Sequence, residues 1–156
     1  MCARTKLPTH KTLYPHNVNA SEGKDVRDMT FSEEAIAIID GKNFAYLATT
    51  MADGSPHISP VWIDRDGATL LINTVPGRIK QKNVSRDPRV AISMIREESP
   101  YRHLFIRGKV IEQTKEGALD HINRLARKYL GKDYPWDDKN RIILRIKPEK
   151  VKMVLD

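Results

Sequence analysis

A group of basic residues follows a Pro-Gly turn in the middle of the chain, and its residue types and spacing could bind an anion. Pro76 and Gly77 precede residues 78–86, which have the pattern of a short helix that ends before Asp87-Pro88. The first turn of a helix carries free backbone N–H groups that attract phosphate. Residues 76–89 contain one acidic residue, Asp87, and five basic ones: Arg78, Lys80, Lys82, Arg86 and Arg89. We interpret this segment as a candidate phosphate site, although a solvated basic helix face would show the same pattern.

Other chemistry receives little support from the residue types. Cys2 is the only cysteine, and the five histidines lack the spacing of metal ligands, so we expect no metal site. The glycine-rich phosphate loops, the nucleophile elbow and the zinc-protease signature are all absent. The sequence therefore offers no motif for acid–base or nucleophilic catalysis.

Length and composition limit the class of protein. The chain has 156 residues, of which 40% are hydrophobic and 30% charged, as expected for one globular domain that crosses no membrane. A formal net charge of +7 favours an anionic partner, either phosphate or nucleic acid. The start of the chain has charge but no apolar region typical of a secretion signal, so we expect a cytoplasmic location.

The candidate phosphate segment lies within a series of short predicted strands. Residues 1–29 have no hydrophobic period and are interpreted as an extended or partly disordered arm, and residues 30–156 form the domain. Thr30 to Glu33 fits a capping box before a short helix that stops at Gly41, and residues 115–130 form an amphipathic helix. Six strands are predicted at residues 44–51, 56–63, 68–74, 89–95, 101–114 and 141–147, with a short tail at 151–155. With few βαβ units, the pattern favours a mainly β, antiparallel barrel with peripheral helices.

Several short motifs, in order along the chain, carry a resemblance to a known family. They include Asp53-Gly54-Ser55-Pro56, Pro60-Val61-Trp62, Asn73-Thr74 followed by residues 77–83, Arg86-Asp87-Pro88-Arg89-Val90, and Ile106-Arg107-Gly108-Lys109-Val110. From residue 30 to residue 155 the chain resembles the pyridoxamine 5'-phosphate oxidase-like flavin and deazaflavin oxidoreductases, in particular their F420-dependent branch. The resemblance implies a six-stranded antiparallel split β-barrel that forms a homodimer with two cofactor sites at the subunit interface.

The resemblance also implies which residues contact the cofactor. Ser59, Pro60, Val61 and Trp62 would border the flavin ring, Asn73 and Thr74 the ribityl chain, and Arg78, Lys80 and Asn83 the phosphate. Tyr101, His103 and Trp136 would approach from the partner subunit or from the substrate side.

Structural roles would also explain three of these residues. Pro60 could simply end strand pairing, and Trp62 shares a strand face with Ile58 and Pro60, as a core residue would. Trp136 could pack over the end of its own barrel.

Two classes of function remain open from the sequence. The first is an oxidoreductase that uses bound coenzyme F420 to transfer hydride to an electron-poor double bond of a small organic substrate. FMN is the alternative cofactor, and a non-catalytic flavin-binding protein is an alternative role. Lys82, Arg86 and Arg89 would accommodate the anionic tail of F420, a group that FMN lacks.

The second class is a nucleic-acid-binding barrel, but no aromatic residues are interleaved with the basic segment to stack on bases.

Overall fold

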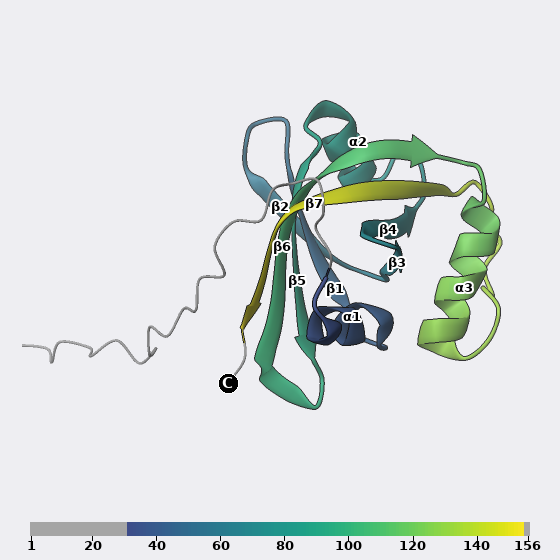
Figure 1. Cartoon of the computed structure of the whole chain (residues 1–156). Coiled ribbons are helices and arrows are strands. Elements are labelled where there is room, and N and C mark those ends of the chain that lie inside the picture. The colour runs from purple at the N-terminus through teal and green to yellow at the C-terminus, as the bar shows by residue number, and fades with distance from the viewer. Residues whose placement is uncertain (1–30, 155–156) are drawn as a thin grey trace, which may run out of the picture.

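The computed structural model describes residues 31–154, which form one antiparallel sheet of seven strands with three helices around it (Figure 1). The strands are β1 (Ala45–Thr50), β2 (Pro56–Val61), β3 (Asp64–Asp66), β4 (Thr69–Thr74), β5 (Arg89–Arg96), β6 (Ser99–Thr114) and β7 (Ile142–Val154). The helices are α1 (Glu33–Asp40), α2 (Ile79–Arg86) and α3 (Ala118–Leu130). The predicted arm at residues 1–29, as well as Thr30 and residues 155–156, lie outside the described residues.

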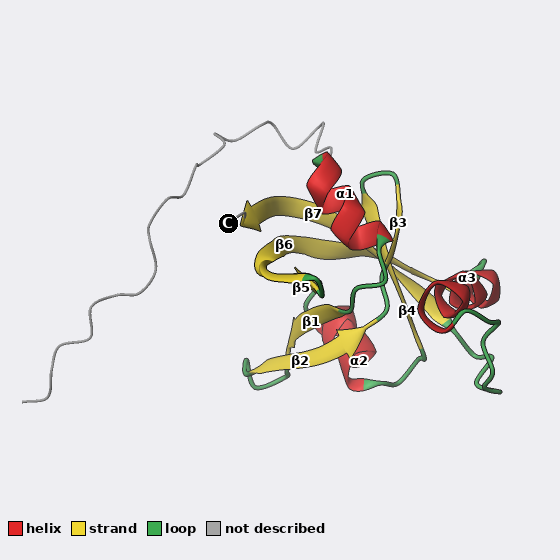
Figure 2. Ribbon diagram, turned by 90° about the horizontal axis from the view of Figure 1, so that it is seen from below, coloured by secondary structure: helices red, strands yellow, loops and turns green. Residues whose placement is uncertain are grey.

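The sheet rolls up around two long strands, β6 and β7, which run through the whole molecule (Figure 1). The strand order is β2-β1-β5-β6-β7-β4-β3, and the pairing of β6 with β7 shifts register beside Gly108 and again after Val110. Such bulges bend a strand and increase its twist. Helices α1 and α2 lie on opposite sides of the rolled sheet (Figure 2). The predicted mainly β, antiparallel architecture is confirmed.

Residues 31–154 contain seven strands, where the sequence predicted six. The additional strand, β3, occupies Asp64–Asp66, which we had expected to form a turn, and it pairs with β4 from Asp64↔Leu71 to Asp66↔Thr69. Arg65 secures this strand through two hydrogen bonds of 2.7 Å from its guanidinium to the Asp40 carboxylate. The predicted tail at residues 151–155 is, as far as Val154, the end of β7, because pairing with β6 continues to that residue.

The start of α1 differs by two residues from the predicted capping box. Ser32 is the N-cap, and its Oγ accepts a hydrogen bond from the Ala35 N–H at 3.2 Å. A serine hydroxyl at this position satisfies one of the otherwise free amides of the first helical turn. The helix ends at Gly41, as predicted.

The main core lies inside the roll and follows the alternation of the strands. In β1, Ala45 and Leu47 point inward and are buried while Tyr46 points outward and is exposed, as the two-residue period requires. In β4, by contrast, Leu70, Leu71 and Ile72 are all buried, because α3 covers the outer face of this strand. No helix among residues 31–154 has the length and apolar character needed to span a lipid bilayer.

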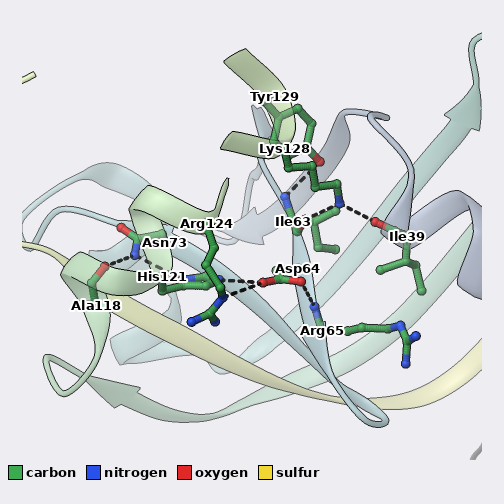
Figure 3. Close-up of polar contacts among 10 residues, drawn as sticks. All are labelled: Ile39, Ile63, Asp64, Arg65, Asn73, Ala118, His121, Arg124, Lys128 and Tyr129. Atoms are coloured by element: carbon green, nitrogen blue, oxygen red, sulfur yellow. Dashed lines mark hydrogen bonds and ion pairs between the residues drawn. The ribbon is translucent and has the colours of Figure 1, made fainter. Parts of the chain in front are cut away.

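Helix α3 is attached to the sheet by apolar and polar contacts. Ile122, Leu125 and Tyr129 form its buried apolar face, whereas Leu119 is exposed. Lys128 Nζ donates hydrogen bonds to the carbonyl oxygens of Ile39 (2.6 Å) and Ile63 (2.9 Å), as shown in Figure 3. Burial lowers the pKa of Lys128, although Asp64 opposes this shift. These contacts fix α3 beside the ends of β2 and β4.

Candidate functional site

A cavity of about 250 Å³ lies where the ends of β2 and β4 meet α2, α3 and the loop that precedes β7. Its lining combines apolar and aromatic side chains with a small number of charged groups, as ligand pockets usually do. The lining residues are Phe44, Pro60, Val61, Trp62, Asn73, Thr74, Arg78, Lys80, Ile122, Leu125, Tyr134, Trp136 and Arg141. The cavity therefore unites most of the predicted cofactor-binding residues.

Flat side chains form one wall of the cavity. The Trp62 ring is parallel to the Tyr129 ring, with centroids 5.2 Å apart and an interplanar angle of 4°. Tyr134 and Trp136 meet edge to face at 5.1 Å on the loop after α3. Trp62 packs against the apolar face of α3, as a core residue would, and it also lines the cavity. A wall of this kind can hold a planar ring system.

Three basic side chains, Arg78, Lys80 and Arg141, face the same cavity. Arg78 is the N-cap of α2 and Lys80 lies in its first turn, so both are next to the free amides of that turn. Burial lowers the pKa of Lys80, and the positive charges of Arg78 and Arg141 lower it further. Within residues 31–154, the Lys80 ammonium group forms no hydrogen bond or ion pair. The cluster has the composition and placement of a phosphate site.

Arg141 is held by the loop between α3 and β7. Its Nη1 donates to Asp138 Oδ2 at 2.7 Å and to the Tyr134 hydroxyl at 3.0 Å, and that hydroxyl donates to Asp138 Oδ1 at 2.6 Å. Burial opposes ionisation of Asp138, but the Tyr134 hydroxyl and the Arg141 charge outweigh it and lower the pKa of Asp138. Asp138 also lies 4.0 Å from Arg78. Asp138 thus contacts two of the three cations, and this one carboxylate leaves the group of three cations with a net positive charge.

Asn73 joins the cavity to the interior beneath α3. Its Oδ1 accepts a hydrogen bond from Arg141 Nε at 2.8 Å, and its Nδ2 donates to the Ala118 carbonyl at 2.8 Å. The position of Arg141 therefore depends on how the Asn73 amide is oriented.

Two predicted contact residues do not line the cavity. Asn83 is buried, and its Nδ2 donates to Thr49 Oγ1 at 3.0 Å and to Met51 Sδ at 3.3 Å. Its side chain joins α2 to β1, because α2 turns this residue away from the cavity and toward the sheet. Ser59 points to the opposite face of β2 from Pro60, and its Oγ is buried without a hydrogen-bond partner in the described part of the chain.

The residues expected to approach from a partner subunit divide into two groups. Trp136 lies at the cavity of its own chain. Tyr101 and His103 lie on β6 near the β5–β6 hairpin, outside the cavity, where His103 Nδ1 is 2.8 Å from the Pro100 carbonyl oxygen. Tyr101 and His103 are therefore available for contact with another molecule.

The basic residues that follow Lys80 do not extend the phosphate site within this chain. Arg86 donates to the Thr50 carbonyl oxygen at 2.6 Å, and Arg89 pairs with Asp87 at 2.6 Å. Lys82, Arg86 and Arg89 do not line the cavity. The structure thus gives no support to their predicted contact with an anionic tail.

Sequence reasoning missed Phe44 and Arg141 as cavity residues. Arg141 is the first residue of the strand predicted at residues 141–147, where a single arginine is typical of a solvated charge. The nearby Tyr134 and Asp138 were the available signal, because a buried arginine needs such partners.

A second cavity, of about 540 Å³, lies on the β3 side of α3. Its cations already have partners: Arg65 pairs with Asp40, Arg124 with Asp64, and Arg145 with Asp66 and Glu112. Among the described residues, no group of histidine, cysteine and acidic side chains could hold a metal ion. The first cavity is therefore the stronger candidate for a functional site.

The fold belongs to a known class of proteins. The chain is a member of the pyridoxamine 5'-phosphate oxidase family, whose sequence model matches residues 31–155. The family predicted from the sequence motifs is thereby confirmed.

Three individual proteins that resemble this chain add detail to the family assignment. An F420H(2)-dependent biliverdin reductase from Mycobacterium tuberculosis (strain CDC 1551 / Oshkosh) is 25% identical over 121 residues, which cover 77% of this chain and 85% of the relative. A solved F420 reductase has a TM-score of 0.72 and 28% identity over 78% of this chain and 98% of its own. The General Stress Protein 26 from Bacillus anthracis, at 18% identity and a TM-score of 0.60, covers 76% and 89% of the two chains and shares the fold. The first two names agree with the enzyme class and the cofactor expected from the sequence.

Proposed function

We propose that this protein is an oxidoreductase that binds coenzyme F420 in the cavity between β2, β4 and α2 and reduces an electron-poor double bond of a small organic substrate. The observation that carries the proposal is the convergence of Arg78, Lys80 and Arg141 on a cavity with aromatic walls. The two relatives named as F420-dependent reductases support the choice of cofactor.

The residues present fit such a cofactor. Arg78, Lys80 and Arg141 would bind its phosphate, and Asn73 and Thr74 its ribityl chain, while Pro60, Val61 and Trp62 would border the ring. A phosphate would also relieve the mutual repulsion that helps to lower the pKa of Lys80. The coenzyme in its reduced state would supply the hydride, and solvent would supply the proton that completes the reduction of the double bond. The protein has to bind and orient the coenzyme, and this task needs no acid–base side chain.

A second copy of the chain would complete the site. The outer face of β2, β1, β5 and β6 exposes Tyr46, Ile58, Ile95 and Phe105. His103 lies on the same face, since it pairs with Ile95. In a homodimer built on this face, Tyr101 and His103 of the partner subunit would be available to the cavity. An exposed apolar face of this kind is typical of an interface.

Fluorescence titration of the purified protein with F420, and separately with FMN, tests the proposal. We expect F420 to bind more tightly, and we expect Arg78→Ala and Lys80→Ala each to weaken its binding roughly 10- to 150-fold, the loss of one charge-assisted hydrogen bond. Arg89→Ala is the matched control, because Arg89 is paired with Asp87 and does not face the cavity. Tighter binding of FMN would favour the FMN-dependent alternative, and equal affinity in wild type and both cavity variants would remove this segment from the site.

Steady-state assay with reduced F420 tests the reaction itself. Oxidation of the coenzyme should depend on an added acceptor with a conjugated, electron-poor double bond. If F420 binds but none of these acceptors is reduced, the result would instead support a role as a cofactor carrier.

A further inference from the structure

His121 is a fully buried titratable residue to which the proposed site assigns no role. It lies on α3, one helical turn before Leu125, and its side chain is 0% exposed. The two ring nitrogens face different partners, as Figure 3 shows. Nδ1 is 3.2 Å from Asn73 Nδ2, and Nε2 is 3.7 Å from Asp64 Oδ2.

The chemistry of its neighbours fixes the orientation of the Asn73 amide. Arg141 can only donate a hydrogen bond, so the atom that faces its Nε must be the amide oxygen. The Ala118 carbonyl can only accept, so the atom that faces it must be the amide nitrogen. The second N–H of that nitrogen is then directed at His121 Nδ1.

This orientation determines the state of His121. Because Asn73 donates to Nδ1, that nitrogen must be unprotonated, and the single ring proton resides on Nε2. The Nε2–H then faces the Asp64 carboxylate, an arrangement favoured by charge. The alternative state, with a proton on Nδ1, would set two N–H groups against each other.

We propose that His121 is a positioning residue: by accepting a hydrogen bond from Asn73, it holds the amide in the orientation that directs Arg141 into the cavity. The chain of contacts runs from Asp64 through His121 and Asn73 to Arg141. The effect of His121 on ligand binding rests on the proposed function, whereas its effect on the orientation of the Asn73 amide does not. His121 itself does not line the cavity.

The first experiment uses the wild-type protein without ligand. Nitrogen NMR of the labelled protein at neutral pH should show His121 neutral, with Nε2 protonated and Nδ1 bare. A proton on Nδ1, or a charged ring, would overturn the proposal, and this result needs no variant to fold.

The second experiment separates positioning from a general structural role. His121→Leu removes the acceptor, whereas His121→Asn can place its amide oxygen near the position of Nδ1. In His121→Leu we expect a shifted Arg141 Nε–H resonance and F420 affinity lowered about tenfold, the effect of one lost hydrogen bond. His121→Asn should restore both toward the wild-type values. Ile106→Val is a control for lost stability, since Ile106 is a core residue outside the cavity.

The outcomes distinguish this inference from the proposed function. An Arg141 resonance that is unchanged in His121→Leu, or changed equally in Ile106→Val, would overturn the positioning role. If F420 fails to bind the wild-type protein, the proposed function fails, and the wild-type tautomer and the Arg141 resonance still decide the inference. If His121→Leu does not fold, the inference is tested by the tautomer of His121 in the wild type and by the Arg141 Nε–H resonance of His121→Asn.

Discussion

The Trp62 and Tyr129 rings stack in parallel 5.2 Å apart, so that the wall of the cavity rests on a residue of α3. Tyr129 is fixed in turn by its hydroxyl, which donates to the Asn43 carbonyl oxygen at 2.7 Å and accepts from the Ile63 N–H at 3.2 Å. Burial, the main cause, raises the pKa of this hydroxyl to about 12. The hydroxyl therefore stays protonated at physiological pH and can make both bonds.

Tyr129→Phe should destabilise the protein while preserving the stack. The substitution leaves a buried Ile63 N–H without its partner, which costs about 1–3 kcal/mol of unfolding free energy. Urea unfolding at neutral pH measures the loss, and F420 affinity should change little because the ring remains. An unchanged unfolding free energy would show that water replaces the hydroxyl at this position.

Gly108→Ala should destabilise the β6–β7 pair. A Cβ at this position would clash with the Lys147 carbonyl oxygen, which belongs to the neighbouring strand and cannot rotate away. We expect a loss of at least about 2 kcal/mol in unfolding free energy, as for other overpacked sites. Lys109→Ala, at the exposed neighbouring residue, is the control and should change it by no more than about 0.5 kcal/mol. Equal stability in the two variants would mean that the bulge can widen at no cost.

The sequence predicted the fold well because its strands and turns have local signals. Asp53-Gly54 marks the turn of the β1–β2 hairpin, and Pro88 marks the end of α2. Both signals act on residues that are close in the chain. Strand β3 was missed because three polar residues have no two-residue hydrophobic period. Its pairing depends on β4 and on Asp40, which is 25 residues away from Arg65.

The site could be predicted only in part, because only some of its residues have a local signal in the sequence. Arg78 and Lys80 are adjacent to a visible turn, so their role could be proposed from spacing alone. Asn83 occupies the same helix, but its burial against Thr49 depends on how α2 docks on β1. Arg141 and His121 join the site through Asn73, across 68 and 48 residues of sequence. Contacts between residues so far apart in the sequence depend on how the sheet folds, and they leave no local sequence pattern.

The stability of the protein should fall in acid partly because His121 is buried. Burial is the main cause that lowers the pKa of His121 to about 4, and Arg124 and Arg141 add to it while Asp64 opposes it. An exposed histidine, as in the unfolded chain, has a pKa near 6.5. As pH falls from about 6.5 to 4, the unfolded chain therefore takes up a proton that the folded protein does not. This difference lowers the unfolding free energy by roughly 3 kcal/mol.

Comparison with His121→Asn isolates this effect from other titrating groups. Unfolding free energies of both proteins, measured by urea between pH 7 and pH 4, should converge toward low pH as the wild type loses its advantage. Parallel curves across this range would mean that His121 has the same pKa in the folded and unfolded states.

The exposed apolar face of the sheet should hold two copies of the chain together. Ile58 is 65% exposed and Phe105 43% exposed, on strands whose register places them on the same face. A stable homodimer needs roughly 2,000 Å² or more of buried surface, and a sheet face of four strands can provide it. We expect a dimer at micromolar concentration in sedimentation velocity.

Phe105→Lys should convert this dimer to a monomer, because the new charge would be buried at the interface and would stand beside Lys152, its neighbour on β7. Leu119→Lys is the matched control: Leu119 is 47% exposed, but it lies on α3 and away from the sheet face. The control should sediment as the wild type does. Loss of F420 affinity together with the dimer in Phe105→Lys would support a site completed by the partner subunit. A wild-type monomer with full F420 affinity would contradict both the dimer and the assignment of Tyr101 and His103 to the site.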